Sequence, residues 1–169
     1  MADDAPYGVS RVADWLLLGG HIPGPEHIGW LREQGVTHVI CAACELSDRR
    51  LCDEHDLRYY HLYWHDDRQP KSAGELCYLL TWLSGEQAAL VESGKPMRLY
   101  VHCAAGYNRG PLVATFLLAA RCGLSAGQAW ERVKASRPGV TAFEQAVYRE
   151  SCETALAEFA QSIQPPEPE

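Results

Sequence analysis

The order of apolar and polar segments predicts a single α/β domain with a mainly parallel central sheet flanked by helices. Two observations support this fold class. The chain has 169 residues, 47% hydrophobic and 22% charged, which suits one globular domain with a buried core. Short β-branched or apolar runs also alternate with longer segments of helical periodicity. We therefore expect residues 9–164 to form the domain, after a flexible leader at 1–8 and before a disordered tail at 165–169.

The first half of the chain predicts strands separated by short helices. An apolar run ends at the turn-forming pair Gly19-Gly20. Pro25 suits the first turn of a helix, and Gly35 suits the end of that helix. The predicted elements are a strand or hairpin at 12–18, a helix between Pro25 and Gly35, a buried strand at 36–41, a helix at 46–55 and a strand at 58–63.

The second half predicts helices around one further strand. Three Ser or Thr residues are followed three positions later by Glu or Gln, which is the spacing of a capping box at a helix start. The segment 110–122 is almost wholly apolar, so we expect a helix buried in the centre. The predicted elements are an amphipathic helix from Ser72 to Gly94, a strand at 97–102, the central helix, and helices starting at Ser125 and Thr141 with a break at Pro138-Gly139.

The charge balance and the cysteines limit the function classes. Lys and Arg number 15 against 22 Asp and Glu, so the net charge of −7 disfavours non-specific binding of nucleic acid or acidic membranes. With no export signal or apolar span recognisable, we expect a cytoplasmic protein. Seven cysteines in such a chain indicate reduced thiols. Cys41 and Cys44 have the spacing of a redox or zinc pair, but no second pair completes a site, so we expect neither metal nor cofactor.

The segment from His102 to Gly110 carries the chemistry. A predicted strand ends in a loop that begins at Cys103 and empties into the central helix at Arg109. Such a loop can turn successive N–H groups inward and, with the helix dipole, bind a tetrahedral oxyanion. The same field lowers a thiol pKa that is ordinarily about 8.5. We therefore predict a phosphate-binding loop lined by Ala104, Ala105, Gly106, Tyr107, Asn108 and Gly110, with a Cys103 nucleophile and a bidentate Arg109.

His102, Cys103, Gly106 and Arg109 together resemble the signature of the cysteine-dependent protein tyrosine phosphatase superfamily, and the chain is most similar to its small dual-specificity group. The resemblance implies a phosphocysteine intermediate, no cofactor, and a phosphorylated protein or small phosphate ester as substrate. It also implies an acid on a separate loop. Trp64-His65-Asp66 is similar to the family's Trp-Pro-Asp pattern, which nominates Asp66 with Asp67 as the alternative.

Two features depart from that pattern. Gly110 stands where the family usually has Ser or Thr, which predicts slow breakdown of the phosphocysteine or, as an alternative, a phosphate-recognising module with impaired turnover. The loop has no cation besides Arg109, which disfavours highly phosphorylated inositides. The order Gly-Tyr-Asn-Arg also resembles RNA 5′-triphosphatases, and a Cys in a loop over a helix is shared with sulfurtransferases. In some relatives the catalytic Cys forms a disulfide, for which Cys41 and Cys44 are the candidates here.

Overall fold

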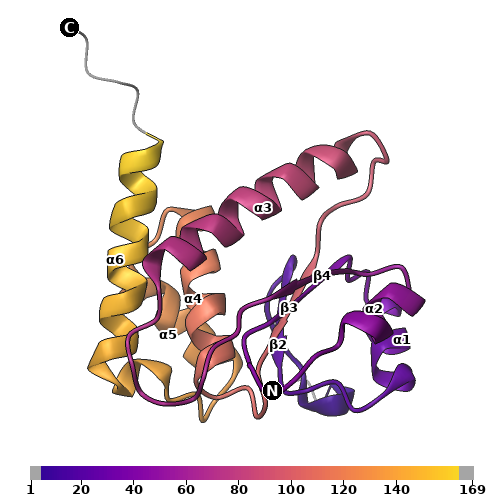
Figure 1. Ribbon diagram of the computed structural model, residues 1–169, viewed down its shortest axis with the longest axis horizontal. Coiled ribbons are helices and arrows are strands. Elements are labelled where there is room, and N and C mark those ends of the chain that lie inside the picture. The colour runs from indigo at the N-terminus through magenta and orange to yellow at the C-terminus, as the bar shows by residue number, and fades with distance from the viewer. Residues whose placement is uncertain (1–4, 164–169) are drawn as a thin grey trace, which may run out of the picture.

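The sheet is built from five short strands, and all neighbouring pairs except the first are parallel. The computed structural model describes residues 5–163. The strand order is β1-β2-β5-β3-β4, with β1 antiparallel to β2 (Figure 1). The mainly parallel sheet confirms the predicted fold class. The strands are β1 Ser10–Ala13, β2 Leu16–Gly19, β3 His38–Cys41, β4 Arg58–His61 and β5 Leu99–His102.

Helices cover both faces of this sheet, because alternate residues of the buried strands point to opposite sides. Leu17 and Tyr100 face one core with α1 and α2, whereas Leu16 and Val101 face the larger core with the remaining helices. Figure 1 shows α1 and α2 on one side, α4, α5 and α6 on the other, and α3 crossing above. The helices are α1 Pro25–Glu33, α2 Arg49–Glu54, α3 Ala73–Val91, α4 Arg109–Cys122, α5 Ala126–Ser136 and α6 Ala146–Ser162.

The helix α4 is the centre of the larger core, as predicted. Its residues from Arg109 to Ala119 are all buried. Their small and apolar side chains let α4 pack against β2, β5 and three other helices. The start of α4 is thereby held in place directly behind the loop that follows β5.

Sequence spacing predicted two of the three helix starts correctly. Ser125 and Gln128 form a complete capping box, and the Ser72 hydroxyl accepts the N–H of Glu75. The helix start at Thr141 was wrong: a 3-10 turn occupies Ala142–Glu144, and α6 begins at Ala146. The Thr141 side chain is turned toward the 103–109 loop, where its hydroxyl donates to Asn108 Oδ1 (2.5 Å), and the Glu144 N–H donates to the Thr141 backbone carbonyl (3.0 Å) and not to its side chain.

The chain ends were predicted to be a leader and a tail. Residues 1–4 and the predicted tail at 165–169 lie outside the described residues. In the rest of the predicted leader, Pro6–Gly8 forms a 3-10 turn, and the Tyr7 ring stacks on His27 with 4.3 Å between centroids. None of the helices within residues 5–163 combines the length and the apolar character needed to span a bilayer.

Candidate active site

The loop between β5 and α4, residues 103–109, is held by its outward-facing carbonyls. The Ala104 carbonyl accepts from the His21 N–H (2.9 Å), and the Tyr107 carbonyl accepts from the Thr141 N–H (2.9 Å). Between them, the carbonyls of Ala105 and Gly106 both accept from the Arg137 guanidinium (3.3 and 2.8 Å). All peptide bonds described are trans, and in a trans peptide the N–H points opposite to the preceding carbonyl. The N–H groups of residues 105–108 therefore face the inside of the loop. Together with the start of α4, they form a nest for an anion.

Gly106 is required at the tightest point of this loop. Its φ of 77° is in the left-handed region, which side chains rarely adopt. A Cβ there would also lie 2.5 Å from the Gly19 carbonyl oxygen at the end of β2. The loop therefore packs directly against the neighbouring strand, and only glycine allows this approach.

Cys103 lies at the base of the loop, with 3% of its surface exposed. The first turn of α4 is immediately beside it: a Cβ built at Gly110 would lie 3.4 Å from the Cys103 Sγ. The N-terminal end of a helix dipole stabilises negative charge placed beside it. Because position 110 is glycine, no hydroxyl from that position reaches the sulfur.

A buried ion pair lies behind Cys103. The His102 Nδ1 is 3.2 Å from the Cys103 carbonyl oxygen, and the His102 Nε2 is 2.7 Å from the Asp48 carboxylate. Burial favours neutral imidazole, but the adjacent Asp48 and Cys41 side chains outweigh it and raise the pKa of His102 to about 10. His102 is then an imidazolium at neutral pH, and it adds positive charge next to Cys103.

The same region brings three potential metal ligands together. Ligand-type atoms of Cys41, Asp48 and His102 lie within 4.8 Å of one another. The His102 Nε2 and the Asp48 carboxylate oxygen are, however, only 2.7 Å apart. Two ligands about 2.0–2.2 Å from one tetrahedral zinc ion would lie roughly 3.3 Å apart. The geometry therefore favours an ion pair over a metal site.

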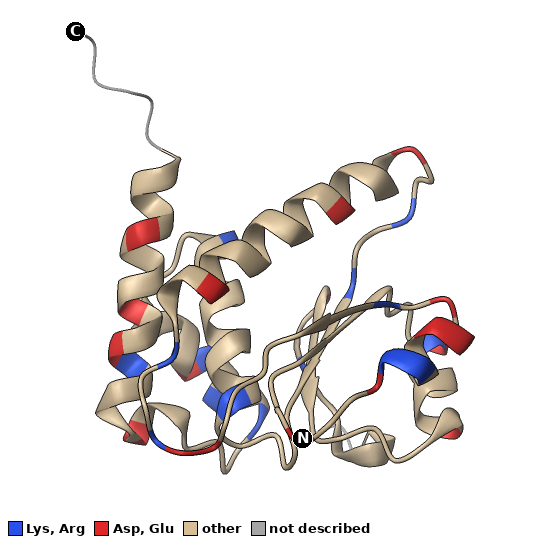
Figure 2. Ribbon diagram, in the orientation of Figure 1, with Lys and Arg blue, Asp and Glu red and all other residues tan. Residues whose placement is uncertain are grey.

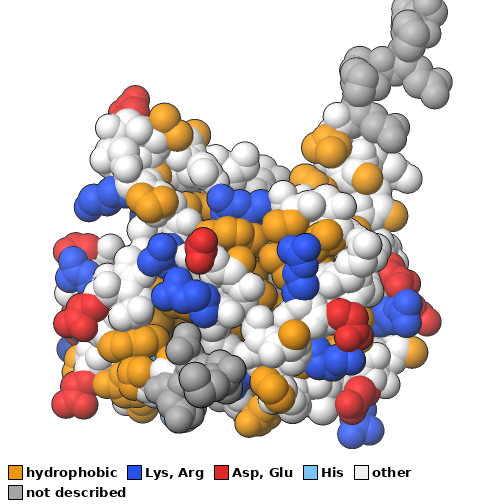
Figure 3. All heavy atoms as spheres, turned by 180° about the vertical axis from the view of Figure 1, so that it is seen from behind, with side chains coloured by type: hydrophobic (Ala, Val, Ile, Leu, Met, Phe, Trp, Pro, Cys, Tyr) orange, Lys and Arg blue, Asp and Glu red, His pale blue; other side chains and the backbone are white. Residues whose placement is uncertain are grey.

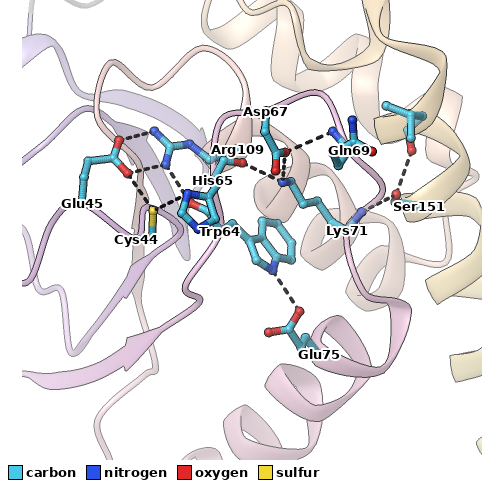
Figure 4. Close-up of polar contacts among 11 residues, drawn as sticks. Cys44, Glu45, Trp64, His65, Asp67, Gln69, Lys71, Glu75, Arg109 and Ser151 are labelled. Atoms are coloured by element: carbon cyan, nitrogen blue, oxygen red, sulfur yellow. Dashed lines mark hydrogen bonds and ion pairs between the residues drawn. The ribbon is translucent and has the colours of Figure 1, made fainter.

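Arg109 is held by Glu45 and by the chain after β4 (Figure 4). Its guanidinium donates to both Glu45 carboxylate oxygens (2.7 and 2.5 Å) and to the Trp64 carbonyl (2.8 Å). Arg109 lowers the pKa of Glu45 to about 2, and Glu45 raises the pKa of Arg109 above its ordinary value. The buried Arg109 Nε forms no hydrogen bond within residues 5–163, so this donor is available to a ligand in the loop.

The loop between β4 and α3, residues 65–72, distinguishes the two candidate acids. Figure 2 shows acidic and basic residues close together on it. Lys71 Nζ donates to Asp67 Oδ1 (2.8 Å), and this contact lowers the pKa of Asp67 (Figure 4). Asp66 is exposed, makes no hydrogen bond or ion pair with any described side chain, and is close enough to Arg109 to raise the pKa of the guanidinium. Asp67 is thus held as a carboxylate by Lys71, whereas the Asp66 carboxyl is exposed and unpaired among the described residues.

Several residues around the loop were not found by sequence reasoning. Asp48 and Arg137 lie in stretches that read as ordinary charged helical surface. Thr141 and Gln145 both donate to the Asn108 side chain, but the sequence signal at Thr141 was that of a helix cap. No local pattern identifies such partners, because each lies more than 30 residues from the atom it contacts.

The cysteines outside the loop are free thiols. Cys41 is buried, and its Sγ donates to the Ala43 carbonyl. Cys44 Sγ lies 3.2 Å from His65 Nδ1 and 3.5 Å from a Glu45 carboxylate oxygen. A disulfide between either residue and Cys103 stays a prediction.

No family model and no curated protein matches this sequence. Solved structures do match it. PTPMT1 in complex with PI(5)P superposes with a TM-score of 0.76 at 16% identity, over 92% of this chain and 99% of that one. The fold is that of small dual-specificity-like cysteine phosphatases. A mouse putative dual specificity phosphatase complexed with zinc tungstate superposes with a TM-score of 0.71 at 21% identity, over 99% of this chain and 98% of that one. Human DUSP28 superposes with a TM-score of 0.69 at 22% identity, over 92% of this chain and 98% of that one.

Proposed function

We propose that this protein is a phosphomonoesterase that acts through a phosphocysteine intermediate. One observation carries the proposal: a buried cysteine lies in a loop whose N–H groups face inward and whose last residue is a buried, bidentate-held arginine. This arrangement binds a tetrahedral dianion and places a nucleophile beneath it. The shared fold with cysteine phosphatases supports the same assignment.

In the first step, the Cys103 thiolate attacks phosphorus, and the bond between phosphorus and the ester oxygen breaks. The inward N–H groups and Arg109 hold the equatorial oxygens as charge develops on them. Asp66 donates its proton to the leaving oxygen, because an unprotonated alkoxide or phenoxide leaves slowly. Lys71 keeps Asp67 ionised, which supports Asp66 as the acid.

In the second step, water attacks the phosphocysteine, the P–S bond breaks, and Cys103 returns as a thiolate. Asp66, now a carboxylate, accepts the proton that the water loses. With Gly110 beside the sulfur, no hydroxyl at that position assists the departing thiolate. We infer that this step limits turnover.

The substrate class that we propose is a phosphorylated protein or a small phosphate ester. Arg109 is the one cation in the 103–109 loop, which suits a single phosphate group. The neighbour PTPMT1 has been solved with PI(5)P, a small phosphate ester, which is compatible with this class. The loop interior offers no further cation for additional phosphates.

Hydrolysis of 4-nitrophenyl phosphate tests the proposal. We expect wild-type activity that vanadate inhibits and that Cys103→Ser abolishes. Cys122→Ser is the matched control, because Cys122 is an exposed cysteine at the far end of α4. Absence of hydrolysis, combined with alkylation of Cys103 at the rate of an ordinary thiol and no protection by vanadate, would contradict the proposal.

A second candidate function is phosphate recognition with little turnover, and Gly110 is the observation that favours it. Rapid mixing with the same substrate separates the two. A stoichiometric burst followed by sustained hydrolysis indicates an enzyme, whereas a burst with no subsequent turnover indicates a binding module.

A further inference from the structure

A cavity of about 640 Å³ lies at the opposite end of the sheet from the 103–109 loop. Its lining includes Leu99, the first residue of β5, and Met97 shortly before it, whereas Cys103 follows the end of that strand. One wall is α3, and the other walls are the last turns of α4 and α6. Figure 3 shows hydrophobic side chains gathered in the hollow between the projecting ends of α3 and α6. The volume is in the range of sites that bind small molecules.

The interior of this cavity does not suit a peptide. Four hydroxyls line it, those of Tyr78, Thr81, Ser84 and Ser162. Those of Thr81 and Ser162 already donate within their own helices, to the Cys77 carbonyl (3.2 Å) and the Phe159 carbonyl (2.7 Å). A peptide would carry one N–H and one C=O group per residue into this largely apolar space, more than these few side chains can satisfy. An alkyl chain has no such groups. The walls therefore favour a hydrocarbon body.

The edge of the cavity carries a positive charge. Arg121, at the end of α4, lines the cavity, and its guanidinium lies 4.3 Å from the centre of the Trp15 ring. None of the ion pairs formed among residues 5–163 includes Arg121. Stacking on Trp15 positions the guanidinium, and its planar donors match the two oxygens of a carboxylate.

We propose that this cavity binds a free long-chain carboxylate, with the alkyl chain between α3 and α4 and the carboxylate on Arg121. The charge of Arg121 next to an apolar interior selects this occupant over a neutral or cationic amphiphile. The proposal is independent of the proposed phosphatase function, because the cavity and the 103–109 loop share no residue.

Calorimetric titration of the full chain with decanoate, below its micellar concentration, tests the site. We expect saturable binding at one site per chain. Lengthening octanoate to decanoate, and decanoate to dodecanoate, should tighten binding by up to about tenfold each, because two further methylenes are buried. Decyltrimethylammonium has the same chain with the opposite charge and should bind at least tenfold more weakly. Absence of saturable binding by decanoate, or equal binding of the cation, overturns the proposal.

Variants locate the ligand. Thr81→Trp fills the cavity from α3 and should weaken decanoate binding more than tenfold. Ala88→Trp places the same side chain on an exposed position of α3 outside the cavity and should change nothing. Arg121→Gln should weaken decanoate about tenfold and should not weaken the cation, because the like charge is removed. Ser84→Trp, on the same cavity wall, replaces Thr81→Trp if that variant does not fold. Unchanged decanoate binding in the Trp variants at 81 and 84 overturns the assignment.

Discussion

The two loops that meet at Arg109 are held in very different ways. The 103–109 loop is fastened from outside at four successive carbonyls, and Cys103 and Arg109 are 3% and 2% exposed. The 65–72 loop is exposed at every residue from 65 to 70, and its main fastening is Lys71. This contrast suits two different roles for the loops. The groups that bind charge are preorganised, whereas the proposed proton donor is on a solvent-exposed segment with few contacts to the rest of the chain.

Breaking the rigid loop should have the largest effect. We expect Gly106→Ala to abolish hydrolysis and to lower the free energy of unfolding by about 3 kcal/mol or more, since a Cβ would clash with Gly19 at a left-handed backbone position. Gly94→Ala is the matched control: its φ is also positive, but nothing lies within 4 Å of the added Cβ. That variant should lose only about 1 kcal/mol and keep full activity. If urea denaturation gives the same decrease in unfolding free energy for both variants, packing of the loop against β2 is unimportant.

Changing the exposed 65–72 loop should affect catalysis but not stability. We expect Asp66→Asn to lower kcat about 10²- to 10⁴-fold for aryl phosphates with poor leaving groups, and less for good ones, because the lost proton matters most to the former. The basic limb of the pH–rate profile should disappear. Asp67→Asn is the control and should keep that limb, since Asp67 is bound to Lys71. The reverse pattern would transfer the role of acid to Asp67.

The ion pair behind the rigid loop makes its stability pH-dependent. The folded-state pKa of His102 is raised to about 10 from 6.5, so the pair contributes fully below pH 6.5 and its contribution is lost as the pH rises toward 10. We expect Asp48→Asn to cost roughly 1–3 kcal/mol in urea denaturation at pH 6.5 and progressively less at higher pH. Asp53→Asn, an exposed change on α2, is the control. If the difference in unfolding free energy between wild type and Asp48→Asn is the same at pH 6.5 and pH 10, the ion pair does not contribute to stability in this way.

The smallest expected effect is a gain within the rigid loop. Gly110→Ser places a hydroxyl near the Cys103 sulfur, and one hydrogen bond to a departing thiolate should speed phosphocysteine breakdown roughly tenfold. Gly110→Ala adds the same Cβ without the hydroxyl and should not accelerate the step. Rapid-quench measurement of the burst and the steady state reads the effect directly. Equal rates in the Ser and Ala variants would mean that breakdown is not limited by thiolate departure.

Local sequence was sufficient for the strand–loop–helix unit. The run up to His102 is apolar, the following helix is almost wholly apolar, and Cys103, Gly106 and Arg109 are close neighbours in the chain. Their relative positions depend mainly on the backbone of one short segment, so spacing predicts them. The alternation of strands and helices likewise predicted the parallel sheet, because each connection has the length of a crossover helix.

Only the tertiary structure decided which distant groups complete this unit. Asp48, Glu45 and Arg137 come from three separate segments and reach the loop through packing that no local pattern encodes. Asp66 and Asp67 differ because Lys71 pairs with Asp67 alone. The Lys71 N–H donates to the Ser151 hydroxyl on α6, and its side chain donates to Asp67. A residue type and its spacing specify what one segment can do, but the charge and hydrogen-bond partners of that segment depend on which other parts of the chain the fold places against it.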